Sequence, residues 1–146
     1  MIGRDLTMKK QTDELLNELN HTPHIDQYLK NNADYLIDQS LANYLCDKLE
    51  EKNISKADII KKSDINEIYG YQLLSGKRTP SRNKLLCICI GAGFTLEETN
   101  ETLKVGGFSP LFPKIKRDSI IIFGIQNNQT LLQINESLYT HQLQTL

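Results

Sequence analysis

Basic residues gather in one short stretch of this chain. The sequence has 146 residues and a formal net charge of −1, yet the segment "SGKRTPSRNK" at 75–84 holds Lys77, Arg78, Arg82 and Lys84. Cations at this density, beside a glycine and a proline, are typical of a loop that contacts phosphate groups. A solvated turn between two helices has the same composition, and charge alone does not separate the two interpretations.

The near-neutral total conceals an uneven distribution of charge. Residues 1–51 carry five basic and ten acidic side chains, whereas residues 52–84 carry eight basic and three acidic ones. Binding to a polyanion depends on the contacting face and not on the total charge. The basic segment is therefore sufficient for a nucleic-acid contact, although two helices with solvated lysines would show the same excess.

Residues suited to catalysis or metal binding are sparse. Cys87 and Cys89 lie in the apolar run "LLCICI" without a neighbouring histidine or aspartate, and Cys46 stands alone. A metal site needs more ligands than this, so we expect free, mostly buried thiols. His21 and His24 receive no role. No glycine-rich phosphate loop and no nucleophile setting is recognisable, so we expect no enzyme activity and no cofactor.

The hydrophobic content is that of a globular protein, with 39% hydrophobic and 24% charged residues. No apolar run reaches the roughly 18 residues that a bilayer span requires. The N-terminal stretch lacks the apolar core of a secretory signal. Together with the odd number of cysteines, these features predict a cytoplasmic protein that contacts no membrane.

Apolar spacing and capping residues predict helices along nearly the whole chain. Residues 41–49, for example, place apolar side chains at helical spacing behind a serine cap. The expected N-terminal caps are Thr22, Ser40, Ser55, Asn66, Ser81, Thr95 and Thr130. Gly76 has the conformational freedom to end the helix that Asn66 begins. We therefore expect an all-α fold.

The last third of the chain repeats itself. Residues 82–111 align with residues 117–146 at an offset of 35, with 8 identities in 30 positions. The shared residues include Arg82/Arg117, Thr95/Thr130, Asn100/Asn135 and Glu101/Glu136. We interpret the two stretches as copies of one helical hairpin, joined by the proline-bearing "FSPLFPK". The added apolar surface suits self-association, and it equally suits a larger core.

The basic segment has the arrangement of a known DNA-binding motif. The text "SKADIIKKSDINEIYGYQLLSGKRTPS" holds two short helices, a tight turn and a final Gly-Lys-Arg-x-Pro. In these residues the stretch 40–104 resembles the helix-turn-helix domain of Cro and phage-repressor-like transcriptional regulators, the XRE-like family. The resemblance implies a five-helix lambda-repressor-like domain at 39–112, after an acidic, partly helical arm at 1–38 and before an extra C-terminal hairpin at 113–146.

The segment departs from the family pattern at several positions. Lys56 stands where glutamine is common, which suits a phosphate contact rather than adenine recognition. Asp64 replaces the turn glycine, and aspartate tolerates the left-handed conformation better than most residues. Gly70 occupies a core position of the second helix, where we expect a gap that Tyr69 or Tyr71 fills.

By position in the family, the second helix of the pair would lie in the major groove. The residues facing the bases would be Asn66, Glu67, Ile68, Tyr71 and Gln72. Gln72 suits a bidentate pair with adenine, Glu67 suits cytosine, and Ile68 suits a thymine methyl group. This helix has no lysine or arginine, so its affinity would come from phosphate contacts. The basic residues placed for them are Lys56, Lys77, Arg78, Arg82 and Lys84.

Three functional hypotheses follow. The first is a sequence-specific transcriptional regulator that binds double-stranded DNA as a homodimer. The second is a protein-interaction adaptor or antitoxin-like partner on the same scaffold, which an apolar surface at Ile68 and Tyr71 would suit. The third is that the acidic arm, residues 1–38, folds over the basic segment and competes with DNA.

Overall fold

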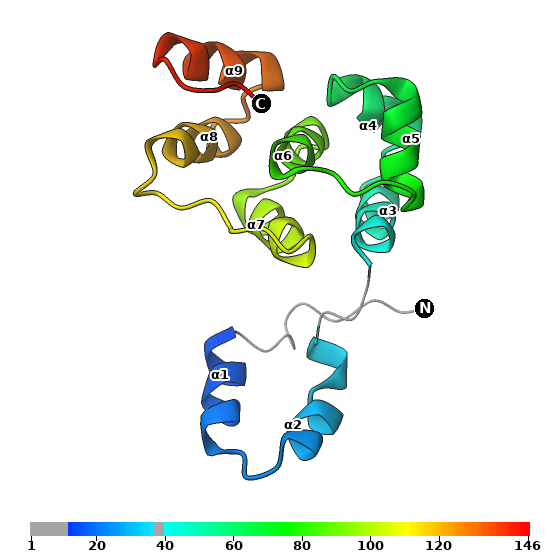
Figure 1. The fold of residues 1–146 in the computed structure, drawn as a ribbon, viewed down its shortest axis with the longest axis vertical. Helices are drawn as coiled ribbons and strands as arrows, with labels where there is room; N and C mark the ends of the chain where they lie inside the picture. Colours follow the sequence, from blue (N-terminus) through cyan, green and yellow to red (C-terminus); the bar gives the residue numbers. More distant parts are fainter. Residues whose placement is uncertain (1–11, 37–39) are drawn as a thin grey trace. The chain divides into compact units, whose positions relative to one another are not determined.

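The computed structural model describes residues 12–36 and 40–146. Within these two ranges the secondary structure consists of α-helices and one short 3-10 helix, without a strand (Figure 1). The predicted all-α class is confirmed for this part of the chain. The chain divides into two units, residues 1–38 and 39–146. None of the helices in the described ranges has the length and apolarity to cross a membrane.

The N-terminal unit is a pair of helices followed by a single 3-10 turn. Its elements are α1 (Thr12–His21), α2 (Ile25–Asn31) and η2 (Ala33–Tyr35). Helix α2 begins after His24, not after Thr22 as predicted. The hydroxyl of Thr22 instead donates to the backbone oxygen of Glu18, four residues earlier, at 2.6 Å. It is thereby used at the end of α1. The first eleven residues of the predicted arm lie outside the described residues.

The second unit contains seven helices. They are α3 (Leu41–Glu51), α4 (Lys56–Lys62), α5 (Glu67–Ser75), α6 (Arg82–Gly91), α7 (Leu96–Val105), α8 (Lys116–Gln126) and α9 (Leu131–Thr140). All but α8 begin at a side chain that accepts a hydrogen bond from the backbone N–H three residues later. These caps are Ser40, Ser55, Asn66, Ser81, Thr95 and Thr130, as predicted.

One hydrophobic core holds this unit together. Helix α6 lies at its centre and contacts α4, α7 and α9, while α3 contacts α5 and α7 (Figure 1). Ile121, Ile134 and Leu138 of the C-terminal hairpin are completely buried in the same cluster as Leu85 and Leu103. Residues 39–146 therefore form one compact unit, which includes the C-terminal hairpin at 113–146. A two-helix hairpin is too small to bury its apolar face alone.

The offset of 35 residues also relates the hydrogen bonds of the two hairpins. Both α7 and α9 begin with a complete capping box. Left-handed backbone at Gly93 (φ 70°) and Gly107 (φ 79°) is matched at Asn128 (φ 54°) and Gln142 (φ 61°). The contacts are reciprocal, since α6 packs on α9 and α8 packs on α7. The two copies thus face each other in a pseudo-two-fold arrangement.

Candidate nucleic-acid interface

A four-residue turn joins α4 to α5. Asp64 lies in this turn with a φ of 53°, which confirms that it adopts the left-handed conformation. Asn66 then caps α5 by accepting the N–H of Tyr69 at its side-chain oxygen, at 3.2 Å. Helix α5 ends at Gly76, whose φ of 84° also lies in the left-handed region. The sequence between Lys62 and Lys77 thus fixes both ends of the helix.

Helix α5 has one face in the core and one face in solvent. Leu73 and Leu74 are buried, and they pack in the cluster with the core residues of α3 and α4. On the opposite face Ile68 is 70% exposed and Tyr71 is 42% exposed. Asn66 and Glu67 are exposed as well, and Gln72 is half-buried at the edge of this face. All five residues predicted to read bases therefore have exposed or half-buried side chains.

The space beside Gly70 is filled by Ile60 and not, as predicted, by Tyr69 or Tyr71. A β-carbon at Gly70 would lie 2.7 Å from Cγ1 of Ile60. The isoleucine of α4 therefore occupies the space, and neither Tyr69 nor Tyr71 fills it. The close approach requires glycine here, because any side chain would overlap a buried β-branched residue.

The two cations that follow α5 are held close to it. Lys77 and Arg78 are both exposed. The N–H of Arg78 donates to the backbone oxygen of Gln72 at 3.2 Å. The Arg78 guanidinium lies 5.8 Å from the centre of the Tyr69 ring, within the range of a cation–π contact. Tyr69 thus positions Arg78 beside the helix, a role that no spacing rule in the sequence indicated.

A second group of cations lies on α4. Lys56 is the first residue of α4, Lys61 and Lys62 lie in its last turn, and all three are exposed. Within the described ranges, none of the three has a carboxylate within 4.0 Å. The same holds for Lys77 and Arg78. Their charges are therefore available to an external anion.

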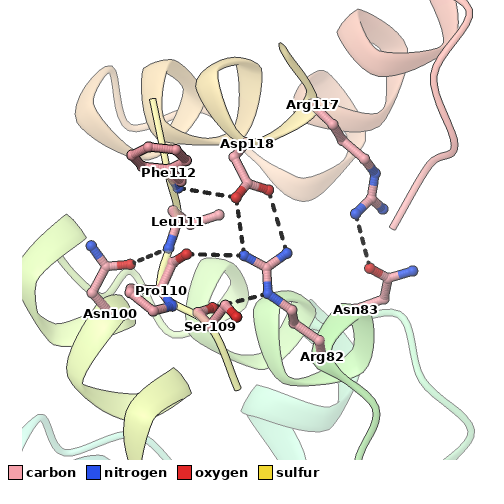
Figure 2. Close-up of polar contacts among 9 residues, drawn as sticks. All are labelled: Arg82, Asn83, Asn100, Ser109, Pro110, Leu111, Phe112, Arg117 and Asp118. Carbon is pink, nitrogen blue, oxygen red and sulfur yellow. Dashed lines mark hydrogen bonds and ion pairs between the residues drawn. The ribbon is translucent and has the colours of Figure 1, made fainter. Parts of the chain in front are cut away.

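Arg82 is placed differently from these cations. Its guanidinium pairs with both oxygens of Asp118, at 3.3 and 3.1 Å, and donates to the backbone oxygens of Ser109 and Pro110 (Figure 2). The same Asp118 carboxylate accepts the N–H of Phe112 at 3.0 Å. These contacts use four of the five N–H donors of Arg82. Arg82 therefore joins the two hairpins, whereas the prediction gave it a phosphate contact.

Arg117 makes the matching contacts in the second copy. It donates to the backbone oxygens of Gln144 and Thr145, which lie 35 residues beyond the partners of Arg82. Its third contact is with Asn83, the residue that corresponds to Asp118, at 3.1 Å (Figure 2). Burial and the nearby Arg82 charge lower the pKa of Arg117 from its ordinary value. The repeat thus extends from the backbone to these polar side chains.

The cysteines belong to the packing of the core. Cys87 and Cys89 are buried in α6, and burial raises the pKa of Cys89 to about 12 and also raises that of Cys87. Both thiols therefore stay protonated at neutral pH and are poor nucleophiles. Cys46 donates to the backbone oxygen of Leu74 at 3.3 Å. Across the described ranges, no three His, Cys, Asp or Glu side chains gather as metal ligands.

Comparison with known proteins gives no guide to this surface. No family model, no curated protein and no solved structure matches the chain. Its assignment depends on the exposed face of α5 and on the cations beside α4 and α5.

Proposed function

We propose that residues 40–104 form an XRE-like helix-turn-helix domain that binds double-stranded DNA, and that the protein regulates transcription. The observation that carries this proposal is the exposed face of α5 together with the unpaired cations around it. Helix α5 lies on the side of α6 opposite to α8 and α9, at the periphery of its unit (Figure 1). A duplex has access to it there without a rearrangement of the core.

In the proposed complex α5 enters the major groove. The groove is about 12 Å wide and accepts an α-helix with its side chains. Ile68 and Tyr71 project furthest toward the bases, because they are the most exposed apolar residues of α5. Gln72 pairs with adenine through its amide, and Glu67 accepts from cytosine. Asn66 offers its amide nitrogen, since its side-chain oxygen already caps the helix.

Phosphate contacts supply most of the affinity. Lys77 and Arg78 follow the C-terminal end of α5, and Lys56 is the first residue of α4, the other helix of the pair. In the proposed complex all three contact phosphates beside the groove. Each phosphate contact releases counterions from the DNA. It makes the slope of log K against log salt more negative by about 0.9. Under this proposal α5 reads the bases and the basic residues around it bind phosphates, which explains why a helix without cations is followed by a basic loop.

Selection of duplex DNA from a random pool tests the proposal. The wild-type protein enriches a short motif, and Gln72→Ala changes the preference at one position of it. Gln126→Ala serves as the matched control, because Gln126 is an exposed glutamine of α8. It selects the wild-type motif. A pool that shows no enrichment with folded wild-type protein contradicts the proposal.

A second candidate function is a protein-interaction adaptor. The observation that favours it is the exposure of Ile68, at 70%, on a helix face without lysine or arginine. In that case no DNA motif is enriched, and a defined partner protein binds the wild type but not Ile68→Glu. Under this alternative Arg78→Ala has little effect on partner binding, which separates it from the DNA proposal.

A further inference from the structure

The internal repeat extends to the segments that lead into the two hairpins. Residues 77–81 precede α6 and residues 112–116 lead into α8, and the two segments are 35 positions apart. The first segment is the basic loop, which the proposed function places on DNA phosphates. The second segment, "FPKIK", also contains two cations, Lys114 and Lys116. It lies outside residues 40–104, the part of the chain that resembles the helix-turn-helix family.

The two cations of this second basic segment are free to bind an external group. Lys114 and Lys116 are exposed, and within the described ranges neither has a carboxylate within 4.0 Å. The single Asp or Glu of residues 109–126 is Asp118, whose side chain is 4% exposed and bound to Arg82. The segment thus presents two unpaired positive charges to solvent, and such charges favour contact with a polyanion.

Side-chain contacts hold the second basic segment beside the first turn of α6. On one side of the segment, Arg82 donates to the backbone oxygens of Ser109 and Pro110, at 3.0 and 3.3 Å. On the other side, Arg117 donates to the side-chain oxygen of Asn83 at 3.1 Å (Figure 2). Arg82 and Asn83 are the first two residues of α6. The basic loop and the second basic segment therefore lie at the same end of this helix.

We infer that Lys114 and Lys116 bind the phosphate backbone of the DNA that flanks the site read by α5. This inference rests on the proposed binding of DNA through α5. Helices α5 and α8 lie on opposite sides of α6 (Figure 1), so a duplex that continues past the first turn of α6 reaches the second basic segment. Contacts to phosphate carry no sequence information. The flanking DNA therefore adds affinity and leaves the selected motif unchanged.

Binding to two duplexes that share the selected motif tests the inference. One duplex ends at the motif, and the other continues on each side for about eight base pairs, roughly 27 Å of B-DNA. The wild type binds the longer duplex more tightly. Lys114→Gln/Lys116→Gln binds that duplex at least about fivefold more weakly than the wild type, and its slope of log K against log salt is shallower by about 2. On the short duplex the two proteins have the same affinity.

The matched control is Lys114→Arg/Lys116→Arg, which keeps both charges and therefore keeps the wild-type affinity and slope on the longer duplex. Both lysines are exposed, so the thermal unfolding of the two variants matches that of the wild type. An arginine variant that loses as much affinity as the glutamine variant overturns the inference, because the loss then does not follow the charge.

Two results separate this inference from the proposed function. A wild type that binds the short duplex, with a glutamine variant that binds the longer duplex as tightly as the wild type does, overturns the role of the second basic segment and leaves the role of α5 intact. A folded wild type that binds neither duplex overturns the proposed function, and the inference with it.

Discussion

The guanidinium of Arg82 lies 3.1 Å from the carboxylate of Asp118, which is 36 residues later in the chain (Figure 2). The side chain of Asp118 is 4% exposed. Its oxygens receive two contacts from Arg82 and one from the backbone of Phe112. One carboxylate thereby fixes the first hairpin, the linker and the second hairpin relative to one another.

Removal of that carboxylate destabilises the protein. Asp118→Ala lowers the free energy of unfolding by about 2–3 kcal/mol, because it leaves Arg82 and the N–H of Phe112 without their acceptor. Asp118→Asn costs less, since Asn83 performs the same function for Arg117 in the other copy. Urea unfolding measures both values. An alanine variant as stable as the wild type contradicts the assigned role of Arg82.

A compensating pair of residues inside the repeat gives a second prediction. Cys89 and Thr99 of the first hairpin correspond to Gly124 and Ile134 of the second, so a large residue on one helix accompanies a small one on the other. A β-carbon at Gly124 would overlap Cγ1 and Cδ1 of Ile134.

Gly124→Cys therefore lowers the free energy of unfolding by about 1–3 kcal/mol through overpacking. Adding Ile134→Thr recovers part of this loss, because it reproduces the pair found in the first hairpin. A double-mutant cycle in urea gives the coupling energy between the two positions. Purely additive effects contradict direct packing of the two residues.

Glu98 makes stability depend on pH. Burial alone would raise the pKa of Glu98, but the N–H of Thr95 and the ammonium groups of Lys52 and Lys48 outweigh it and lower that pKa. The Lys52 contact is 3.1 Å long. A lowered pKa in the folded state means that ionised Glu98 stabilises the fold above the unfolded pKa, near 4.3. This stabilisation is lost as the pH falls through the folded pKa.

Glu98→Gln removes that part of the pH dependence and keeps the capping box, as Gln133 does at the equivalent position of α9. Its stability changes less than that of the wild type between pH 6 and pH 3, a window set by the glutamate pKa of about 4.3. Thermal unfolding across this range makes the comparison. Parallel curves for the two proteins contradict the prediction.

Arg78 contributes to affinity for every DNA sequence. Arg78→Ala weakens binding to the selected motif and to unrelated duplexes alike, and it lowers the slope of log K against log salt by about 1. Lys104→Ala is the matched control, because Lys104 is an exposed cation on α7. Fluorescence anisotropy at several salt concentrations gives both slopes. An equal slope for wild type and Arg78→Ala removes Arg78 from the interface.

Local features of this fold were predictable from the sequence. The caps at Ser55, Asn66 and Thr95 act on backbone three residues away, so a short window of sequence contains the whole interaction. The left-handed conformation of Asp64 was predictable from its place at the turn position where the family pattern has glycine. Thr22 is the exception, because its hydroxyl bonds backward to α1 instead of forward to α2.

Contacts between distant residues were not predictable in the same way. The charge density around Arg82 suggested a phosphate contact. Its side chain instead binds Ser109 and Asp118, which are more than 25 residues away and therefore lie outside any short window of sequence. Gly70 suggested a gap in the core, but the side chain of Ile60 fills that space. The position of Ile60 depends on how α4 crosses α5, which the sequence does not show. The residues of α5 that reach solvent were selected by their positions in the family that the sequence resembles. The contact of Arg78 with the Tyr69 ring depends instead on the path of the chain after Gly76.

Mapping of backbone amide shifts on addition of a selected duplex tests the central claim most directly. If α5 reads the groove, the largest changes in the ¹H–¹⁵N spectrum fall on Glu67, Ile68, Tyr71 and Gln72 and on Lys77 and Arg78, while α8 and α9 change little. Changes that cluster on α8 and α9 and leave α5 unaffected would contradict it.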